Sequence, residues 1–270
     1  MIIDFHTHVF PDKIANATVA ALAKSTNIPA YSDGTLDSLL LSLEEAGVDV
    51  AVNLPVLTRP TQFDSVLNFA SVLNEKSYTG SRIISFAGAH PDMENPEEKL
   101  ALVKERGFLG IKIHPDYQAT FFDDEKYLRI LRVAKELDLI TLTHAGVDGA
   151  YPGEPVKCTP ERVLRALDKI GGYDKLVLAH YGANFLFDEV LRSLAGLPIY
   201  FDTAYMLHNI DTELFLKILD RHGSERVLFA TDSPWRNIKE EVEMIKRYHL
   251  DPVAENNIFS QNAKKLLKIR

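Results

Sequence analysis

Two histidines near the start of the chain are spaced for joint metal binding. His6 and His8 come at the end of residues 2–5, a short apolar run that reads as a buried strand. Because side chains alternate faces along a strand, two histidines that lie two positions apart point the same way. Neutral imidazole nitrogens bind Zn²⁺ at about 2.0–2.1 Å. The pair therefore predicts a divalent-ion site, provided that other strands supply further ligands.

Further candidate ligands and proton carriers accompany later apolar runs. They are His90, Lys112, His114, His144, His180 and Asp232. Six of the nine histidines, His6 and His8 included, end such runs. Imidazole and carboxylate groups suit Zn²⁺, and other first-row ions accept the same groups. A bound ion of this kind lowers the pKa of a water to near 7, so the pattern is compatible with hydrolysis at neutral pH.

The elements that must position these side chains alternate between strand and helix. Eight short runs are apolar at successive positions, as in parallel strands that are covered on both faces: 2–5, 48–54, 83–87, 108–113, 139–143, 175–179, 198–202 and 226–231. Eight amphipathic stretches between them predict helices: 35–46, 61–75, 96–106, 123–137, 160–170, 185–195, 211–221 and 238–248. One more helix, at about 260–267, follows the last unit.

Eight strand–helix units in about 250 residues are typical of a (β/α)₈ TIM barrel. A doubly wound open sheet is the alternative, since local patterns do not show whether a sheet closes. We expect a single α/β domain over residues 1–270, because the sequence has no linker or low-complexity tract. Barrel active sites gather at the carboxyl ends of the strands, where the candidate ligands would meet. Residues 9–34 are the one long insertion, and we expect a loop there, either a lid over that rim or a variable surface loop.

Composition limits the partners and the compartment. The chain has 270 residues and a formal net charge of −8, which argues against nucleic acid or an anionic membrane as the main partner. Cys158 is the only cysteine, so no internal disulfide can form, as is usual in a reducing compartment. No apolar run approaches the length of a membrane span, and no signal sequence precedes the first strand. We expect a cytoplasmic protein that acts on a small molecule.

The motifs resemble those of a known superfamily. His-x-His on the first strand, histidines on the fifth and sixth and aspartate on the eighth are similar to the metal pattern of the amidohydrolase superfamily. Three segments resemble its amidohydrolase-related branch, which includes aminocarboxymuconate-semialdehyde decarboxylase: Asp4-Phe5-His6-Thr7-His8, Gly110-Ile111-Lys112-Ile113-His114-Pro115 and Ala230-Thr231-Asp232-Ser233-Pro234-Trp235. The tail at residues 258–267 resembles the terminal helix of that branch. The similarity spans nearly the whole chain, but it does not specify a substrate.

The resemblance implies a site with one divalent ion, for which zinc is expected and manganese or iron are alternatives. Its ligands would be His6, His8, His144 and Asp232. His180 would stand beside the ion as a catalytic group that orients the water or polarises the substrate carbonyl. Asp232 would also accept the proton of the water and pass it to the leaving group. Relatives are often dimers, so a homodimer is the implied assembly.

Three residues have two readings each. In some superfamily members a lysine on the fourth strand is carbamylated and bridges two ions, and Lys112 would then share a second ion with His144 and His180. In the branch that this chain resembles the lysine is unmodified, so we expect one ion and a Lys112 that contacts a substrate carboxylate. His114 is either a structural group or a participant. Arg59 either clamps an acidic group of the substrate or is a solvated loop charge.

The sequence thus predicts a metal-dependent hydrolase that directs a metal-activated water at the carbonyl of a small amide, lactone or cyclic substrate. The first alternative is a lyase that decarboxylates an unsaturated or aromatic acid without oxidation, since close relatives use the same ion and histidine for that reaction. The second alternative is a barrel that binds a metal or ligand without turnover. The intact pair of His180 and Asp232 argues against this last reading.

Overall fold

Parallel strands follow one another around a ring. The computed structural model describes residues 1–75 and 82–269. Its strands are β1 (Ile3–Thr7), β2 (Val50–Asn53), β3 (Arg82–Ser85), β4 (Ala87–Gly88), β5 (Gly110–Ile113), β6 (Ile140–Thr143), β7 (Leu176–Leu178), β8 (Tyr200–Asp202) and β9 (Val227–Leu228). Pairing follows chain order within β1-β2-β3 and from β4 to β9. The third predicted run is divided at Phe86 into β3, which pairs with β2, and β4, which pairs with β5.

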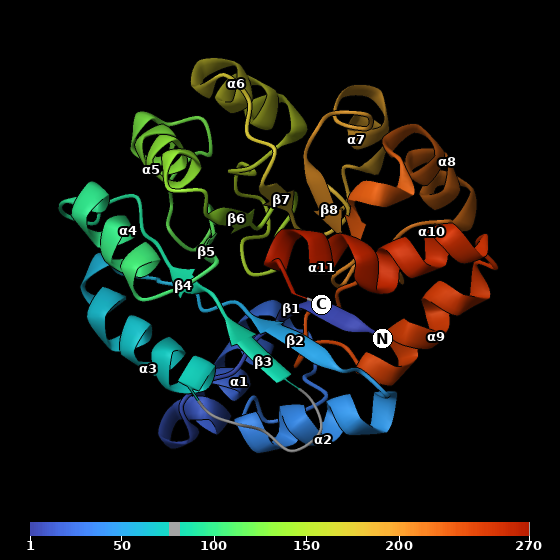
Figure 1. Cartoon of the computed structure of the whole chain (residues 1–270), viewed down its shortest axis with the longest axis horizontal. Coiled ribbons are helices and arrows are strands. Elements are labelled where there is room, and N and C mark those ends of the chain that lie inside the picture. The colour runs from blue at the N-terminus through green and yellow to red at the C-terminus, as the bar shows by residue number, and fades with distance from the viewer. Residues whose placement is uncertain (76–81, 270) are drawn as a thin grey trace.

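The ring closes between the last strand and the first. The backbone N–H of Phe5 donates to the carbonyl of Phe229 at 2.9 Å. Further along, Thr7 and Ser233 form a parallel bridge. Figure 1 shows the strands as a central ring with helices around it. The predicted TIM barrel is therefore confirmed, and the alternative of an open doubly wound sheet is wrong.

Helices lie around this ring and at both of its ends. They are α1 (Asp12–Thr26), α2 (Leu36–Ala46), α3 (Phe63–Glu75), α4 (Pro96–Glu105), α5 (Glu125–Glu136), α6 (Pro160–Ile170), α7 (Phe187–Ser193), α8 (Thr212–His222), α9 (Ile238–Arg247), α10 (Pro252–Asn256) and α11 (Asn262–Leu267). The helix α6 has the predicted bounds, and its Thr159 accepts the N–H of Arg162 as an N-cap. None of the described helices is long and apolar enough to span a bilayer.

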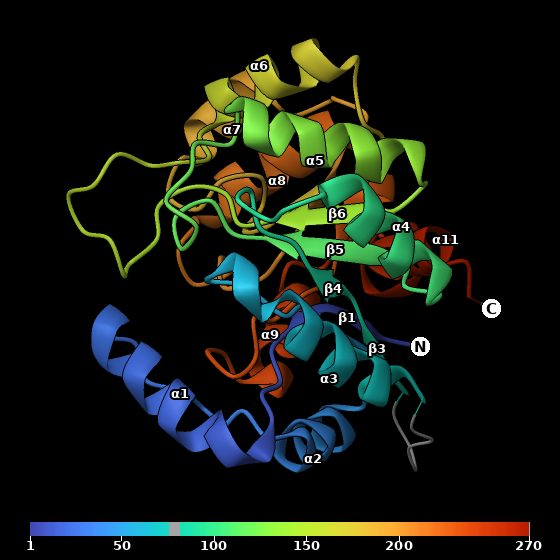
Figure 2. The same ribbon diagram turned by 90° about the vertical axis from the view of Figure 1, so that its left-hand side faces the viewer.

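The expectation of a loop over residues 9–34 is wrong, because α1 occupies most of this insertion. The signal was local: five alanines lie between residues 15 and 23, and alanine has the highest helix propensity. In Figure 2, α1 extends beyond one end of the barrel, while both chain termini lie at the opposite end. The insertion therefore places a helix, rather than a loop, beside the carboxyl rim.

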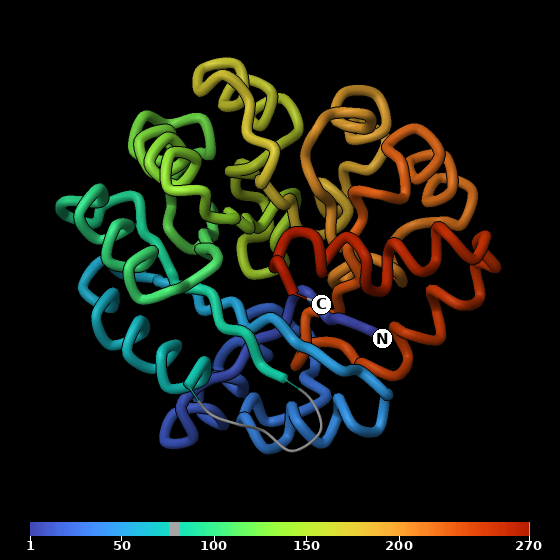
Figure 3. Tube along the Cα trace, viewed as in Figure 1, coloured from blue at the N-terminus to red at the C-terminus, as the bar shows by residue number. Residues whose placement is uncertain are grey.

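The barrel interior is a separate apolar core, and α11 covers it at the amino end of the strands. Inward side chains such as Phe5, Val52 and Leu142 form this core, and Ala263 and Leu266 of α11 pack against it. The trace in Figure 3 shows the C-terminal segment crossing the end of the ring, beside the N-terminus. The extra C-terminal helix thus seals the amino end of the barrel, which leaves the carboxyl end for a site.

An irregularity in β1 decides which way the two histidines point. Between Asp4 and Thr7, β1 has one residue more than the paired segment of β2, a register shift typical of a β-bulge. Phe5 faces the barrel core, so strict alternation would turn His6 to the outside. With the shift, His6 instead contacts Lys112 and Asp202, which project inward from β5 and β8. The bulge therefore re-aims the His-x-His pair into the mouth of the barrel.

Candidate metal centre

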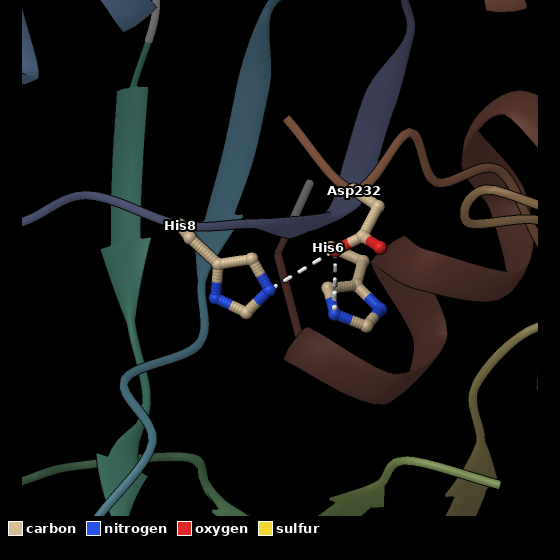
Figure 4. A group of neighbouring side chains, drawn as sticks. All are labelled: His6, His8 and Asp232. Atoms are coloured by element: carbon tan, nitrogen blue, oxygen red, sulfur yellow. Dashed lines mark hydrogen bonds and ion pairs between the residues drawn. The ribbon is translucent and has the colours of Figure 1, made fainter. Parts of the chain in front are cut away.

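Three predicted ligands from the two ends of the chain meet at the carboxyl rim. Nε2 of His8 lies 3.1 Å and Nε2 of His6 lies 3.5 Å from Oδ1 of Asp232. Figure 4 shows both rings directed at this carboxylate. Ligand atoms of the three residues all lie within 4.8 Å of one another. We call this group the first triad.

The protonation pattern of His8 fits a cation in the first triad. Nδ1 of His8 lies 2.9 Å from the carbonyl of Leu54, which only accepts, so Nδ1 carries the proton. In a neutral ring Nε2 is then a lone pair, and it faces a carboxylate oxygen of Asp232. Two such atoms at 3.1 Å need a proton or a metal ion to join them. Two imidazoles and a carboxylate are also a donor set that catalytic zinc sites use, with a further position left open.

The charge states of the first triad also suit a metal ion. Burial, reinforced by the charge of Lys112, lowers the pKa of His6 well below its usual range, so this ring is neutral. Burial alone would raise the pKa of Asp232, and positive charge on the side of His6 and His8 is what holds this pKa below its usual range. When both rings are neutral, a bound cation has to supply that charge. Neutral imidazole and ionised carboxylate are the forms that bind metals.

Asp202 is a functional residue that the sequence reading missed. Its Oδ2 accepts from Nδ1 of His6 at 2.8 Å, and its Oδ1 accepts the backbone N–H of His180 at 2.9 Å. A carboxylate behind a ligand histidine fixes the tautomer and the orientation of the ring. Asp202 is the last residue of a predicted strand, and this position at the carboxyl rim could have identified it as a candidate site residue. Asp4, by contrast, accepts from the hydroxyl and the N–H of Thr231 and holds β1 beside β9.

Lys112 lies against the first triad. Its Nζ lies 3.2 Å from Nε2 of His6, and its side chain is almost fully buried. Burial lowers the pKa of Lys112 to about 8, although Asp202 and Asp232 pull the other way. A lysine with this pKa is partly neutral near neutral pH, so it can act as a hydrogen-bond donor to His6 without a full permanent charge.

His144 and His180 form a hydrogen-bonded chain beside the first triad. Nδ1 of His180 lies 2.8 Å from the carbonyl of Ala204 and must donate to it. Nε2 of His180 is then the acceptor for Nδ1 of His144, at 2.9 Å. The remaining nitrogen of His144, Nε2, has no hydrogen-bond partner among the described residues. Both ring nitrogens of His180 are thus engaged, and its catalytic role stays a prediction.

The four predicted ligands do not all gather in one group. His144 belongs with His114 and Asp148 to a second group whose ligand atoms lie within 4.8 Å of one another. The rings of His114 and His144 stack at 4.3 Å. That His144 shares an ion with the first triad therefore stays a prediction.

Backbone conformation at the rim is unusual for residues with side chains. Both His180 and Asp232 have positive φ angles, 59° and 68°. This left-handed region is disfavoured for residues other than glycine, and surrounding structure must hold them there. Asp202 supplies part of that support at His180, and the N–H of Asp232 donates to the carbonyl of His6. Both residues that the sequence predicts to be catalytic are thus among the described non-glycine residues with positive φ angles, as are their neighbours at the rim, Tyr181 and Tyr205.

A cavity of about 500 Å³ opens onto the first triad and onto His144 and His180. Most of its wall is apolar, and α1 contributes Ile14 and Leu22, which lie about two turns apart. The cavity is lined by one lysine, Lys112, and by no arginine of the described chain. Arg59 is exposed at the start of a short helix and is not in the cavity wall, so nothing in the geometry supports the predicted clamp.

Comparison with known proteins agrees with this architecture. A family model described as amidohydrolase matches residues 3–269. Among solved structures, 2,6-dihydroxybenzoate decarboxylase from Rhizobium is 17% identical, with a TM-score of 0.69 over 99% of this chain and 98% of that chain. A dihydroxybenzoic acid decarboxylase from Polaromonas, solved with manganese and 2-nitroresorcinol, is also 17% identical, with a TM-score of 0.69 over 99% and 96% of the two chains.

A neighbour of another reaction class has the same fold. A probable 2-pyrone-4,6-dicarboxylic acid hydrolase from Acinetobacter baumannii is 15% identical, with a TM-score of 0.70 over 99% of each chain. Comparison with curated proteins gave no match. At these identities the neighbours show the fold alone, whereas the family model covers nearly the entire sequence. The chain belongs to the amidohydrolase family.

Proposed function

We propose that residues 1–270 form a single-domain, metal-dependent hydrolase that attacks the carbonyl of a small amide, lactone or other cyclic substrate. The observation that carries the proposal is the position of Asp232 between His6 and His8, on the wall of a cavity that His180 also lines. Membership of the amidohydrolase family supports an enzyme with this general chemistry.

The first triad would hold one catalytic divalent ion. Zinc is the proposed metal, and the manganese in the neighbour from Polaromonas supports manganese as an alternative. When bound, the ion would lower the pKa of a water to near 7 and polarise a carbonyl oxygen. His144 is the predicted fourth ligand. Three protein ligands suffice for a catalytic site, because a further position stays open for water.

Two side chains would manage the protons. Ionised Asp232 can accept the proton of the attacking water, and His180 presents Nε2 as its proton-accepting nitrogen, since Nδ1 is held by Ala204. That Nε2 atom now receives the N–H of His144, so a substrate or water must displace this contact first. The released Nε2 of His180 would then accept a hydrogen bond from the attacking water and orient it, and Asp232 would pass the proton that it accepts to the leaving group.

The cavity wall favours hydrolysis of an uncharged substrate. Beside the apolar side chains and five histidines it has two acids, Asp148 and Asp232, and among the described residues Lys112 is its one lysine or arginine. A dicarboxylate would gain little charge compensation there, whereas an uncharged lactone or amide with an apolar body would bury that body. The first triad would then act on the carbonyl end.

Decarboxylation of an unsaturated or aromatic acid is the second candidate. Lys112 favours it, because a buried ammonium group beside the first triad can pair with one substrate carboxylate. Neighbours with this fold include two decarboxylases of dihydroxybenzoic acids. The two reactions differ in product, so an assay separates them directly.

The test is a substrate panel on protein loaded with zinc or manganese. The panel would contain lactones and amides with apolar groups of increasing size, together with unsaturated and aromatic acids. We expect metal-dependent turnover of a lactone or amide, and a loss of about 10²–10⁴-fold in rate for His180→Asn at unchanged metal content. The exposed His249→Gln is the control and should keep full activity.

Two results would contradict the proposal. Release of CO₂ from an acid, without turnover of any lactone or amide, would make the chain a decarboxylase. Full activity in His180→Asn and in Asp232→Asn would show that neither side chain transfers protons.

A further inference from the structure

We propose that the substrate carries a long, unbranched acyl or alkyl chain, which lies along α1 in a groove between α1 and α3. This inference rests on the proposed function, because it places the carbonyl of that substrate at the first triad. The groove is the part of the cavity wall that four residues of α1 and two of α3 form, namely Ile14, Thr18, Leu22, Thr26, Val66 and Phe69. We call it the chain groove.

One face of α1 lines the chain groove along most of the helix. Its four groove residues recur at every fourth position, from Ile14 to Thr26, and such positions lie on one side of a helix. At roughly 1.5 Å per residue, this face is about 18 Å long. Two other residues of α1, Ala15 and Val19, are buried. The helix thus packs on the protein through one side and presents a second side to the cavity.

Apolar side chains of the chain groove are left partly uncovered by the rest of the protein. Ile14 is 50% exposed, and Leu22, Val66 and Phe69 are of intermediate burial. Val66 and Phe69 lie three positions apart and so share one side of α3. Uncovered apolar surface on a cavity wall marks a site for an apolar ligand. A row of methylene groups in the groove would remove this surface from water.

The charge on the cavity wall is separated from the chain groove. Lys112, Asp148 and Asp232 come from β5 and from the segments after β6 and β9. No charged side chain of α1 or of α3 lines the cavity, although α1 contains Lys13 and Lys24. The cavity therefore fits an amphiphile, with its carbonyl head at the barrel mouth and an uncharged tail between the two helices.

The dimensions favour a chain over a single ring. A ring would cover about one helical turn, or roughly 5.4 Å, of a face that is about 18 Å long. The cavity has a volume of about 500 Å³, which at roughly 30 Å³ for each water-sized group accommodates on the order of fifteen non-hydrogen atoms. A single-ring lactone without a side chain has fewer than half as many. A chain attached to the reacting group would fill the remaining volume along α1.

Contacts at both ends of α1 fix the extent of the chain groove. Before the helix, the N–H of Phe10 donates to the carbonyl of Gly34 at 2.9 Å. After the helix, Ile28 also lines the cavity, and a Cβ atom added at Gly149 would lie 3.7 Å from Cδ1 of Ile28. Gly149 belongs to the segment after β6, so α1 leads from β1 across to that segment. A groove that is bounded in this way predicts an upper limit to the chain length.

The experiment measures hydrolysis as a function of chain length. Lactones and amides with one unbranched side chain, from methyl to dodecyl, would be assayed with the zinc-loaded protein. We expect kcat/KM to rise by up to about fourfold for each added methylene group and to stop rising at a limiting length. Substrates with a branched or a fused aromatic group of the same atom count should gain less, because such groups are shorter and wider than the groove.

Two variants on facing walls obstruct the chain groove. Thr18→Phe fills the middle of the α1 face, and Val66→Phe narrows the α3 side. Both positions are partly exposed, so either variant tests the groove if the other fails to fold. Each should lower kcat/KM for the longest substrates by at least about tenfold and leave the methyl substrates unchanged. Ala20→Phe, at an exposed position on the opposite side of α1, is the matched control and should keep the wild-type profile.

Binding of unreactive chains separates this inference from the proposed function. Calorimetric titration with unbranched alcohols, from butanol to decanol, requires neither hydrolysis nor metal. We expect the affinity of the wild type to rise with chain length, and both variants to weaken the binding of decanol but not of butanol.

The outcomes identify which proposal fails. Chain-dependent binding of alcohols without hydrolysis of any lactone or amide would support the chain groove and overturn the proposed function. Hydrolysis at a rate that is independent of chain length, or a preference for the fused aromatic substrates, would overturn the chain groove and leave the proposed function standing. An affinity for alcohols that does not change with chain length would also overturn the chain groove.

Discussion

Nδ1 of His6 lies 2.8 Å from Oδ2 of Asp202, and both side chains are buried. The contact puts the proton on Nδ1 and leaves Nε2 of His6 directed at Asp232. The other oxygen of Asp202 holds the backbone of His180. One carboxylate from β8 thus orients both a proposed metal ligand and the proposed proton carrier.

The first prediction concerns this carboxylate. Asp202→Asn keeps the shape but replaces an acceptor with an amide that can donate to Nδ1, which favours the wrong tautomer of His6. We expect the metal affinity of the first triad to fall by about 10–100-fold, as for other residues behind metal ligands. Competition with a chromophoric chelator would measure it. The exposed Asp220→Asn should bind like the wild type, and equal affinity in Asp202→Asn would remove the assigned role.

The second prediction distinguishes the two readings of Lys112. Its ammonium group lies 3.2 Å from Nε2 of His6, where it competes with a metal for the lone pair. If the lysine is unmodified, as we predict, Lys112→Met removes that competitor, and the metal affinity of the first triad stays equal or rises by up to about tenfold. A carbamylated lysine would be a ligand, so the same change would weaken binding and the wild type would need bicarbonate. Calorimetric titration with Zn²⁺, with and without bicarbonate, decides between them.

The third prediction concerns the apolar wall that α1 adds to the cavity. Ile14 and Leu22 line it, although Ile14 remains half exposed, so truncation there should not unfold the barrel. Ile14→Ser/Leu22→Ser should lower kcat/KM for substrates with a large apolar group by about tenfold and leave small substrates unaffected. Ala17→Ser/Ala20→Ser changes exposed positions of the same helix and is the control. An equal loss for large and small substrates would mean that α1 does not contact the substrate.

The fourth prediction concerns stability in acid. His222 ends α8, its ring stacks on Phe201 at 3.9 Å, and burial lowers its pKa to about 4. The folded state therefore binds fewer protons than the unfolded state between pH 6.5 and 4, and stability falls as the pH drops through this window. In His222→Gln the free energy of unfolding should decrease between pH 7 and pH 5 by about 2 kcal/mol less than in the wild type.

Urea denaturation at the two pH values measures this difference. His249→Gln is the matched control, because that histidine is exposed, and it should follow the wild type. A pH dependence in His222→Gln as steep as that of the wild type would assign the acid sensitivity to other groups.

Local patterns predicted most of the barrel. Each run of successive apolar residues became a strand, because parallel strands are covered on both faces, and α6 began and ended where Thr159 and Gly171 indicated. The helix α1 was not predicted, although alanine, the residue with the highest helix propensity, occurs five times between residues 15 and 23. Propensity alone contained that information.

The sequence by itself determined the residue types, the strand order and hence the rim at which His6, His8, His180 and Asp232 would lie. Tertiary structure decided the rest. The bulge in β1 turned His6 inward, the closure of the ring brought Asp202 behind it, and the carbonyl of Ala204 set which nitrogen of His180 receives the N–H of His144. Such choices depend on hydrogen bonds between residues far apart in the chain, and no local periodicity records which nitrogen of a ring a distant carbonyl will hold.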